Sequence, residues 1–189
     1  LKKDTVEASQ RKELQDLIAL MKFYGIPKTD QHSVVDLYSY VQKQSTIDSF
    51  STVISRLPQT MQQEIKDFAR IHMIKDFPLF KSTSHEVLVE IARALKPVYI
   101  DPGETIIKYR DVGKEMFFIA YGTLEVLAPN GAHLVNINKG FFGELALFFN
   151  TKRTATIRAL SYCSLFKLEK EDFEPIIKRK SELAYIVKH

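Results

Sequence analysis

One short segment combines a glycine, a carboxylate and a guanidinium at a spacing that suits an anionic ligand. Gly143 and Glu144 follow Phe142, and Arg153 lies nine positions after Glu144. A glycine lets a ligand approach the main chain closely, and an arginine can donate to two phosphate oxygens at once. Glu144 also begins an apolar run to Phe149 that suits one helical turn, whose free N–H groups favour anions.

The carboxylate narrows the class of ligand. Glu144 would repel a phosphate unless the same ligand carried a hydroxyl group that donates to the carboxylate, as a ribose does. These residues therefore predict a site for a sugar phosphate with a free hydroxyl. The alternative without function is a strand, a helical turn and a second strand that carry an exposed Glu144 and a surface Arg153.

The composition is typical of a globular protein. The chain has 189 residues, of which 45% are hydrophobic and 26% charged, enough for one ordinary domain or two small ones. No stretch reaches the roughly 18–20 apolar residues of a membrane helix, and the polar first ten residues do not resemble a signal peptide. The start at Leu1 leads us to expect a fragment of a longer protein. Cys163 is the single cysteine, which excludes an internal disulfide and suits a reducing compartment.

The charged residues argue against several functions. The formal net charge is +4, but residues of both signs alternate and no helix-turn-helix is evident, so we expect no nucleic-acid partner. The five histidines show no spacing typical of metal ligands, and no nucleophile stands beside a base. We therefore expect no metal, no cofactor and no enzymatic activity.

Glycines indicate where strands lie. Six of the seven follow residue 100, and the first five of these are nine or ten residues apart, a spacing typical of short antiparallel strands. Asp101-Pro102-Gly103 suits a type II turn, and Asn130-Gly131 is a strong hairpin signal. The sequence predicts an antiparallel β-roll or jelly roll over about 98–168.

The segments on both sides of the roll are predicted to be helical. A helix that contains Leu14, Leu17, Ile18 and Met21 at helical spacing should end near Gly25. Further helices are expected at about 30–44, 47–57, 60–74 and 83–95, with a terminal helix at about 171–189. The fold class is therefore α+β. The first two helices have apolar faces that either fold back on the roll or pack against another subunit, and the residues leave both possibilities open.

The stretch from Phe142 to Ala159 resembles the phosphate-binding cassette of cyclic-nucleotide-binding domains. The family pattern runs F-G-E-[ILV]-[AC]-L, then a short insert, then R-[TS]-A-[ST]-[VI]-[RK]-A. This chain reads Phe-Gly-Glu-Leu-Ala-Leu from Phe142 and Arg-Thr-Ala-Thr-Ile-Arg-Ala from Arg153.

Three earlier segments resemble the C-linker of cyclic-nucleotide-gated and hyperpolarisation-activated cation channels, and the entry to their binding domain. They are Met21 to Pro27, Leu57 to Ile65 and Phe77 to Phe80. The resemblance implies a helical C-linker over 1–75 that serves oligomerisation and gating, and a cyclic-nucleotide-binding domain over 76–189. A bacterial homologue fits this pattern.

The resemblance also implies roles for individual residues. Arg153 would pair with the cyclic phosphate, Glu144 would accept from the ribose 2′-hydroxyl, and Thr154 would contact the phosphate and the guanine amino group. The main chain at Gly143 and Ala146 would lie against phosphate and ribose. The full implied set is Gly143, Glu144, Leu145, Ala146, Arg153, Thr154 and, against the purine, Val126 and Leu134.

The implied function is that of a gating fragment. It would bind cAMP or cGMP on the cytoplasmic side of the cell membrane and form a homotetramer through residues 1–75. It would act on a preceding pore domain of a cation channel, for which the resemblance implies potassium as the conducted ion. The alternative is a free-standing cyclic-nucleotide receptor such as a protein-kinase regulatory subunit. Because the chain ends at His189, we expect only partial contacts from the terminal helix to the base, which leaves the preferred nucleotide open.

Overall fold

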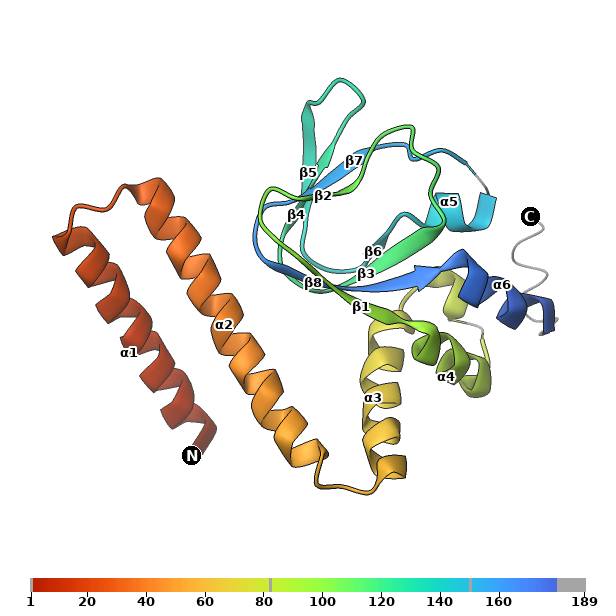
Figure 1. Cartoon of the computed structure of the whole chain (residues 1–189), viewed down its shortest axis with the longest axis horizontal. Coiled ribbons are helices and arrows are strands. Elements are labelled where there is room, and N and C mark those ends of the chain that lie inside the picture. The colour runs from red at the N-terminus through yellow and green to blue at the C-terminus, as the bar shows by residue number, and fades with distance from the viewer. Residues whose placement is uncertain (1, 82, 150, 180–189) are drawn as a thin grey trace. The chain divides into compact units, whose positions relative to one another are not determined.

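The computed structural model describes residues 2–81, 83–149 and 151–179 (Figure 1). Its contacts divide the chain into two compact units, Leu1–Ile54 and Ser55–His189. The first unit is helical, and the second combines helices with two antiparallel sheets. The predicted α+β class is confirmed.

The first unit is a pair of antiparallel helices, α1 (Lys2–Phe23) and α2 (Lys28–Ile54) (Figure 1). The turn between them contains Gly25, as predicted, and the hydroxyl of Tyr38 donates to Glu13 across the pair at 2.8 Å. The prediction of separate helices at 30–44 and 47–57 is wrong, since α2 is continuous. Neither glycine nor proline stands between Gln44 and Ile47 to stop it.

The second unit begins with three helical segments: α3 (Gln59–Ile74), the 3₁₀ helix η1 (Pro78–Phe80) and α4 (His85–Ala94). Arg93 of α4 donates through Nε to the carboxylate of the buried Asp67 on α3 at 2.8 Å. The contacts thus place α3 with the roll. The predicted boundary near residue 75 concerns function and stays a prediction.

Two four-stranded antiparallel sheets form the roll, in the orders β1-β8-β3-β6 and β2-β7-β4-β5. This confirms the β-roll predicted over about 98–168. The helix α5 (Glu144–Phe149) lies between β6 and β7, and α6 (Lys170–Arg179) follows β8. The strands are β1 (Lys96–Ile100), β2 (Thr105–Ile107), β3 (Glu115–Tyr121), β4 (Leu124–Leu127), β5 (His133–Ile137), β6 (Phe141–Phe142), β7 (Thr156–Ala159) and β8 (Cys163–Glu169).

The predicted turns are present. At the type II position, the carbonyl of Asp101 accepts from the N–H of Glu104 at 3.1 Å. In the loop between β4 and β5, the side chain of Asn130 accepts from the N–H of Ala132 at 3.0 Å. The terminal helix is described only as far as Arg179, and the predicted remainder, 180–189, lies outside the described residues.

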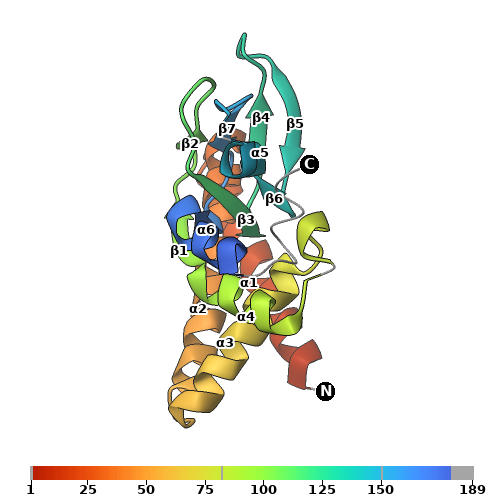
Figure 2. The same ribbon diagram turned by 90° about the vertical axis from the view of Figure 1, so that its right-hand side faces the viewer.

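Two hydrophobic cores share strand β3. Alternation along the strand sends Met116 and Phe118 to one face and Phe117 and Ile119 to the other. The first face packs against α4 and α6, which lie together on one side of the roll in both ribbon views (Figures 1 and 2). The second face packs between the sheets. Glu115 is the first residue of this strand.

No helix among the described residues combines the length and the hydrophobicity that crossing a membrane requires.

Candidate ligand-binding site

A cavity of about 310 Å³ opens in the roll beside α5, within the size range of small-molecule sites. One wall is apolar and comes from strands of the β2-β7-β4-β5 sheet. The opposite side comes from the segments at 141–145 and 152–155. The lining residues are Ile107, Val126, Ile137, Phe141, Phe142, Gly143, Glu144, Leu145, Lys152, Arg153, Thr154, Ala155 and Ile157.

Gly143 occupies the turn between β6 and α5 with φ of +83°, in the left-handed region that glycine adopts without steric cost. A β-carbon at this position would lie 2.7 Å from Nη1 of Arg153 and 3.0 Å from Cδ1 of Ile107. The position therefore requires glycine for two reasons, its main-chain conformation and the close approach of the arginine.

Arg153 is the buried cation of the cavity, with 5% of its surface exposed. Its main-chain N–H donates to the carbonyl of Asp111, and its own carbonyl accepts from the N–H of Arg110, both at 2.9 Å. The guanidinium donates through Nη1 to the carbonyl of Gly143 at 2.9 Å. The cation is therefore already oriented in the cavity wall.

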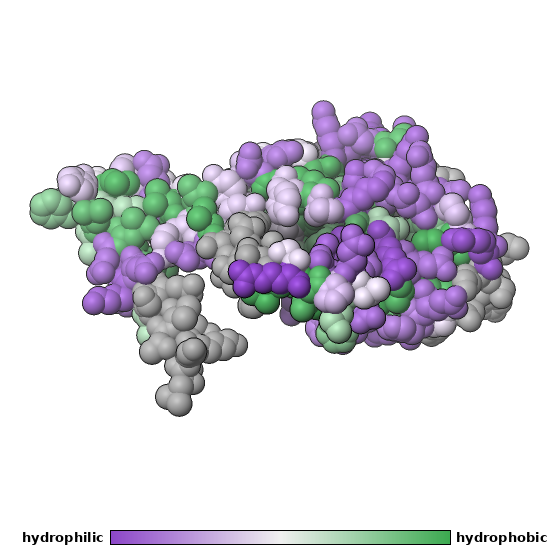
Figure 3. Space-filling model, turned by 60° about the horizontal axis from the view of Figure 1, so that its bottom comes forward, coloured by the Kyte–Doolittle hydropathy of each residue, from purple (hydrophilic) through white to green (hydrophobic). Residues whose placement is uncertain are grey.

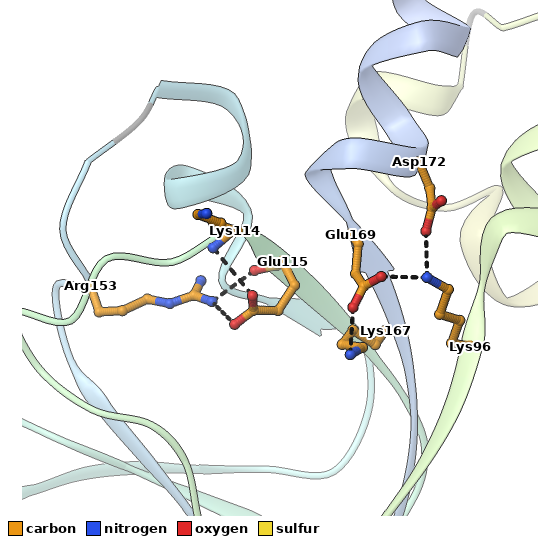
Figure 4. Close-up of polar contacts among 7 residues, drawn as sticks. All are labelled: Lys96, Lys114, Glu115, Arg153, Lys167, Glu169 and Asp172. Atoms are coloured by element: carbon orange, nitrogen blue, oxygen red, sulfur yellow. Dashed lines mark hydrogen bonds and ion pairs between the residues drawn. The ribbon is translucent and has the colours of Figure 1, made fainter.

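Glu115 is the other partner of this guanidinium (Figure 4). Nη2 of Arg153 donates to the main-chain carbonyl of Glu115 at 2.9 Å and to its Oε1 at 2.6 Å. The second carboxylate oxygen, Oε2, accepts from the N–H of Lys114 at 3.2 Å. Sequence reasoning missed Glu115, which lies 38 residues before Arg153. The only available signal was the general need of a buried guanidinium for a counter-charge.

Three further predicted residues line the same cavity. Glu144 is the first residue of α5, and no described residue donates a hydrogen bond to its carboxylate. Leu145 of α5 and Thr154 of the loop before β7 also line the cavity. Ala146 belongs to α5, but its side chain lies outside the described part. The structure thus brings Gly143, Glu144, Leu145, Arg153 and Thr154 together.

The two residues expected against the purine differ in position. Val126 lines the cavity, whereas Leu134 on β5 is 59% exposed and is not part of the lining. The lining residue from β5 is Ile137, which pairs with Leu124. Val126 pairs with Val135, and Ile137 lies two positions further along β5, so Ile137 shares the face of Val126. The register shift falls between the pairs of Val126 and Leu127, where Leu134 has no partner. Sequence reasoning also missed Lys152 and Ile107 in the lining.

A second charged cluster lies outside the cavity, where β8 leads into α6 (Figure 4). Lys96 of β1 contacts Glu169 and lies 2.8 Å from Oδ2 of Asp172, and Lys167 lies 2.7 Å from Oε1 of Glu169. The hydrogen bonds from Lys167 and then Lys96 lower the pKa of Glu169 to about 2. Those to Asp172 and then Glu169 raise the pKa of Lys96. The cluster fastens the start of α6 to both neighbouring strands.

Within the described residues, no group of three or more His, Cys, Asp and Glu side chains is placed to hold a metal ion.

Comparison with known proteins agrees with this geometry. A family model described as "Cyclic nucleotide-binding domain" matches residues 97–180, the range that contains the glycine turn, α5 and the buried arginine. This segment of the chain resembles a cyclic nucleotide-binding domain. Within this segment, Gly143, Glu144 and Arg153 line one cavity, and their roles toward a nucleotide stay a prediction.

Relatives extend the similarity beyond the binding domain. The chain is 24% identical over 174 residues to potassium/sodium hyperpolarization-activated cyclic nucleotide-gated channel 4 of Oryctolagus cuniculus, which covers 92% of this chain and 15% of that protein. It is 25% identical over the same length to channel 2 of Mus musculus and channel 1 of Rattus norvegicus, covering 20% and 19% of those proteins. The predicted resemblance to these channels is confirmed. The chain spans a fifth or less of the curated relatives it matches.

Proposed function

We propose that the binding domain binds a cyclic nucleotide in the cavity beside α5, with Arg153 against the cyclic phosphate. The observation that carries this proposal is the buried guanidinium, held at the carbonyl of Gly143 in the cavity wall. An anion that enters meets a cation that is already desolvated and oriented, so little side-chain freedom is lost on binding.

The remaining lining residues suit the rest of the ligand. Glu144 accepts from the ribose 2′-hydroxyl, and the main chain at Gly143 and Ala146 lies against phosphate and ribose. The apolar side chains of Val126 and Ile137 face the purine, with Thr154 as the polar group near its edge. A ligand without the 2′-hydroxyl leaves the Glu144 carboxylate in the cavity without a donor, which costs free energy. Both cAMP and cGMP carry this hydroxyl and are the proposed ligands.

We also propose that the chain is the cytoplasmic gating part of a cyclic-nucleotide-modulated cation channel, with potassium as the conducted ion. The support is the similarity to hyperpolarization-activated channels over 92% of the chain, which includes helices that the family model does not reach. A free-standing receptor such as a kinase regulatory subunit is the alternative. In the proposed mechanism, the domain has two conformations that differ in the position of α6, and the nucleotide binds one of them more tightly. Binding therefore increases the population of that conformation. The helices that precede the roll transmit this change to a pore domain.

Residues 1–75 are the proposed contact between identical subunits in a homotetramer. Large apolar side chains are exposed there among the described residues, and Figure 3 shows hydrophobic residues gathered on the visible face of the first unit, at the left. Exposed apolar surface of this kind marks interaction sites. The residues are Leu20, Phe23, Tyr24, Val34, Leu37, Val41, Val53, Met61, Ile65 and Phe68.

Calorimetric titration of the chain with cAMP, cGMP and 2′-deoxy-cAMP tests the binding proposal. We expect saturable binding of the first two ligands and roughly tenfold or weaker affinity for the deoxy analogue, since a charged acceptor loses its donor. Absence of binding by both cAMP and cGMP would contradict the proposal. Equal affinity for cAMP and 2′-deoxy-cAMP would contradict only the proposed hydrogen bond from the 2′-hydroxyl to Glu144.

A further inference from the structure

The guanidinium of Arg153 already has a carboxylate partner. Three of its five N–H groups donate within the protein: one to Gly143 and two to Glu115. Oε1 of Glu115 lies 2.6 Å from Nη2 of Arg153, and the side chain of Glu115 is 30% exposed at the cavity end of β3. Figure 4 shows the two side chains meeting end to end.

We propose that Glu115 is an internal counterion that holds Arg153 when no ligand is bound, competes with the cyclic phosphate for it, and thereby lowers and sets the affinity of the cavity. This inference rests on the proposed function, because it names the residue that tunes the same site. Glu115 acts through Arg153 and is therefore a positioning residue, whose own carboxylate does not bind the nucleotide.

The first step of the argument concerns the protein without ligand. A guanidinium buried to this degree is costly unless a counter-charge and hydrogen bonds compensate it. Glu115 supplies both, and its carboxylate is itself fixed by the N–H of Lys114. The pair therefore stabilises the empty cavity.

The second step concerns the ligand. A cyclic phosphate brings one negative charge to a guanidinium that Glu115 already neutralises. The phosphate must share the cation with the carboxylate or displace it, and either event opposes binding. The lining carries two cations, Lys152 and Arg153, and one carboxylate, Glu144. Glu115 is not part of the lining, but its ion pair with Arg153 offsets the remaining positive charge. Removing the charge of Glu115 thus destabilises the empty state while it favours the bound one.

The substitution Glu115→Gln isolates this charge. Glutamine has nearly the same size and keeps an oxygen for Nη2, and the main-chain bond from Arg153 to residue 115 does not depend on the side chain. Calorimetric titration with cAMP should show affinity higher by about tenfold, a factor consistent with one partly exposed charged hydrogen bond. Circular dichroism should show a lower unfolding midpoint without ligand. A merely structural role for Glu115 predicts lower affinity, so the direction of the change decides.

Two companion variants complete the test. Glu115→Asp keeps the charge but is one methylene too short for the 2.6 Å contact. Its cAMP affinity should therefore lie between that of the unaltered chain and that of Glu115→Gln. If Glu115→Gln does not fold, Glu115→Asp serves as the test. Glu171→Gln, which removes an exposed carboxylate of α6 that has no described contact with Arg153, should leave the affinity unchanged.

The outcomes separate the two proposals. Tighter binding by the Glu115 variants, with no change in Glu171→Gln, supports the counterion. Combined with Arg153→Ala, Glu115→Gln should give no further gain, as a double-mutant cycle requires when one residue acts through the other. Unchanged or weaker binding by Glu115→Gln overturns the inference while the proposed function stands. Failure of the unaltered chain to bind cAMP or cGMP overturns the proposed function and this inference with it.

Discussion

The guanidinium of Arg153 lies so close to the main chain of Gly143 that position 143 has no room for a side chain. Nη1 of Arg153 donates to the carbonyl of Gly143 at 2.9 Å, and a β-carbon on the glycine would lie 2.7 Å from the same nitrogen. The turn that opens α5 and the loop that carries the buried cation are therefore one structural unit.

Gly143→Ala should damage both folding and binding. The left-handed φ of +83° is strained for alanine, and the loss of unfolding free energy should be about 1–3 kcal/mol. The displaced guanidinium should lower cAMP affinity by about tenfold or more. Urea unfolding and calorimetry measure the two effects.

Gly131→Ala is the matched control for this prediction. Gly131 has the same φ of +83°, but its added β-carbon would meet nothing within 4 Å. It should therefore lose stability while it keeps its affinity for cAMP. Equal losses of affinity in both alanine variants would show that the contact between Gly143 and Arg153 does not matter for binding.

Thr154→Val should weaken cGMP binding more than cAMP binding. The phosphate and ribose are the same in both ligands, so discrimination depends on the purine edge, where the Thr154 hydroxyl can accept from the guanine amino group. The unaltered chain should bind both nucleotides within about tenfold of each other. Competition titrations on the unaltered chain and on Thr154→Val measure both affinities. An equal loss of affinity for cAMP and cGMP would show that Thr154 contacts only the phosphate.

The whole chain should associate toward tetramers as its concentration rises, and more so with nucleotide if the bound form favours assembly. Charges on the exposed apolar face of the first unit should prevent this, because burying an unpaired charge is costly. We therefore expect Phe23→Asp with Tyr24→Asp to sediment as a monomer. Leu134→Asp, a charge at an exposed apolar position outside residues 1–75, should still associate. A monomer at high concentration with saturating nucleotide would favour a free-standing receptor.

Stability should fall with acid in a window set by Glu169. Its pKa is lowered to about 2 by hydrogen bonds from Lys167 and Lys96, against about 4.3 for an unperturbed glutamate. A carboxyl whose pKa is lower in the folded state stabilises the fold fully above the unfolded pKa, and this contribution disappears as pH falls from about 4.3 toward 2.

Circular dichroism melts at several pH values check this window. Glu169→Gln should have a lower midpoint at neutral pH and a smaller loss between pH 5 and 2 than the unaltered chain. Glu171→Gln removes a carboxylate without these contacts and should follow the unaltered chain. If the unfolding midpoint of Glu169→Gln fell between pH 5 and 2 as much as that of the unaltered chain, the loss of stability would be due to other carboxyl groups.

Local signals in the sequence were enough to predict the roll and much of the candidate site. Turn residues such as Asp101 to Gly103 determine main-chain geometry within a few positions, and the strands follow from their spacing. Gly143, Glu144 and Arg153 stand within eleven residues of one another, so one motif was sufficient to place them in a common cavity.

The features that sequence reasoning missed depend on contacts between distant residues or on register. The pairing of Arg153 with Glu115 arises because β3 and the loop before β7 meet in space, which no local pattern shows. Ile137 lines the cavity in regular register opposite Leu124, whereas Leu134 lies at the register shift of β5 and has no paired residue. The continuity of α2 was missed because the residues between Gln44 and Ile47 are weak helix formers that nonetheless do not end a helix.

The measurement that tests the central claim most directly is the affinity for cAMP of Arg153→Ala beside that of Arg158→Ala. Arg158 also pairs with a carboxylate, since its Nε donates to Glu125 at 2.6 Å, but it does not line the cavity. If Arg153 meets the cyclic phosphate, its loss should weaken binding by at least roughly 10- to 100-fold, with a folded circular dichroism spectrum, while Arg158→Ala binds as the unaltered chain does. Undiminished binding by a folded Arg153→Ala would contradict the account.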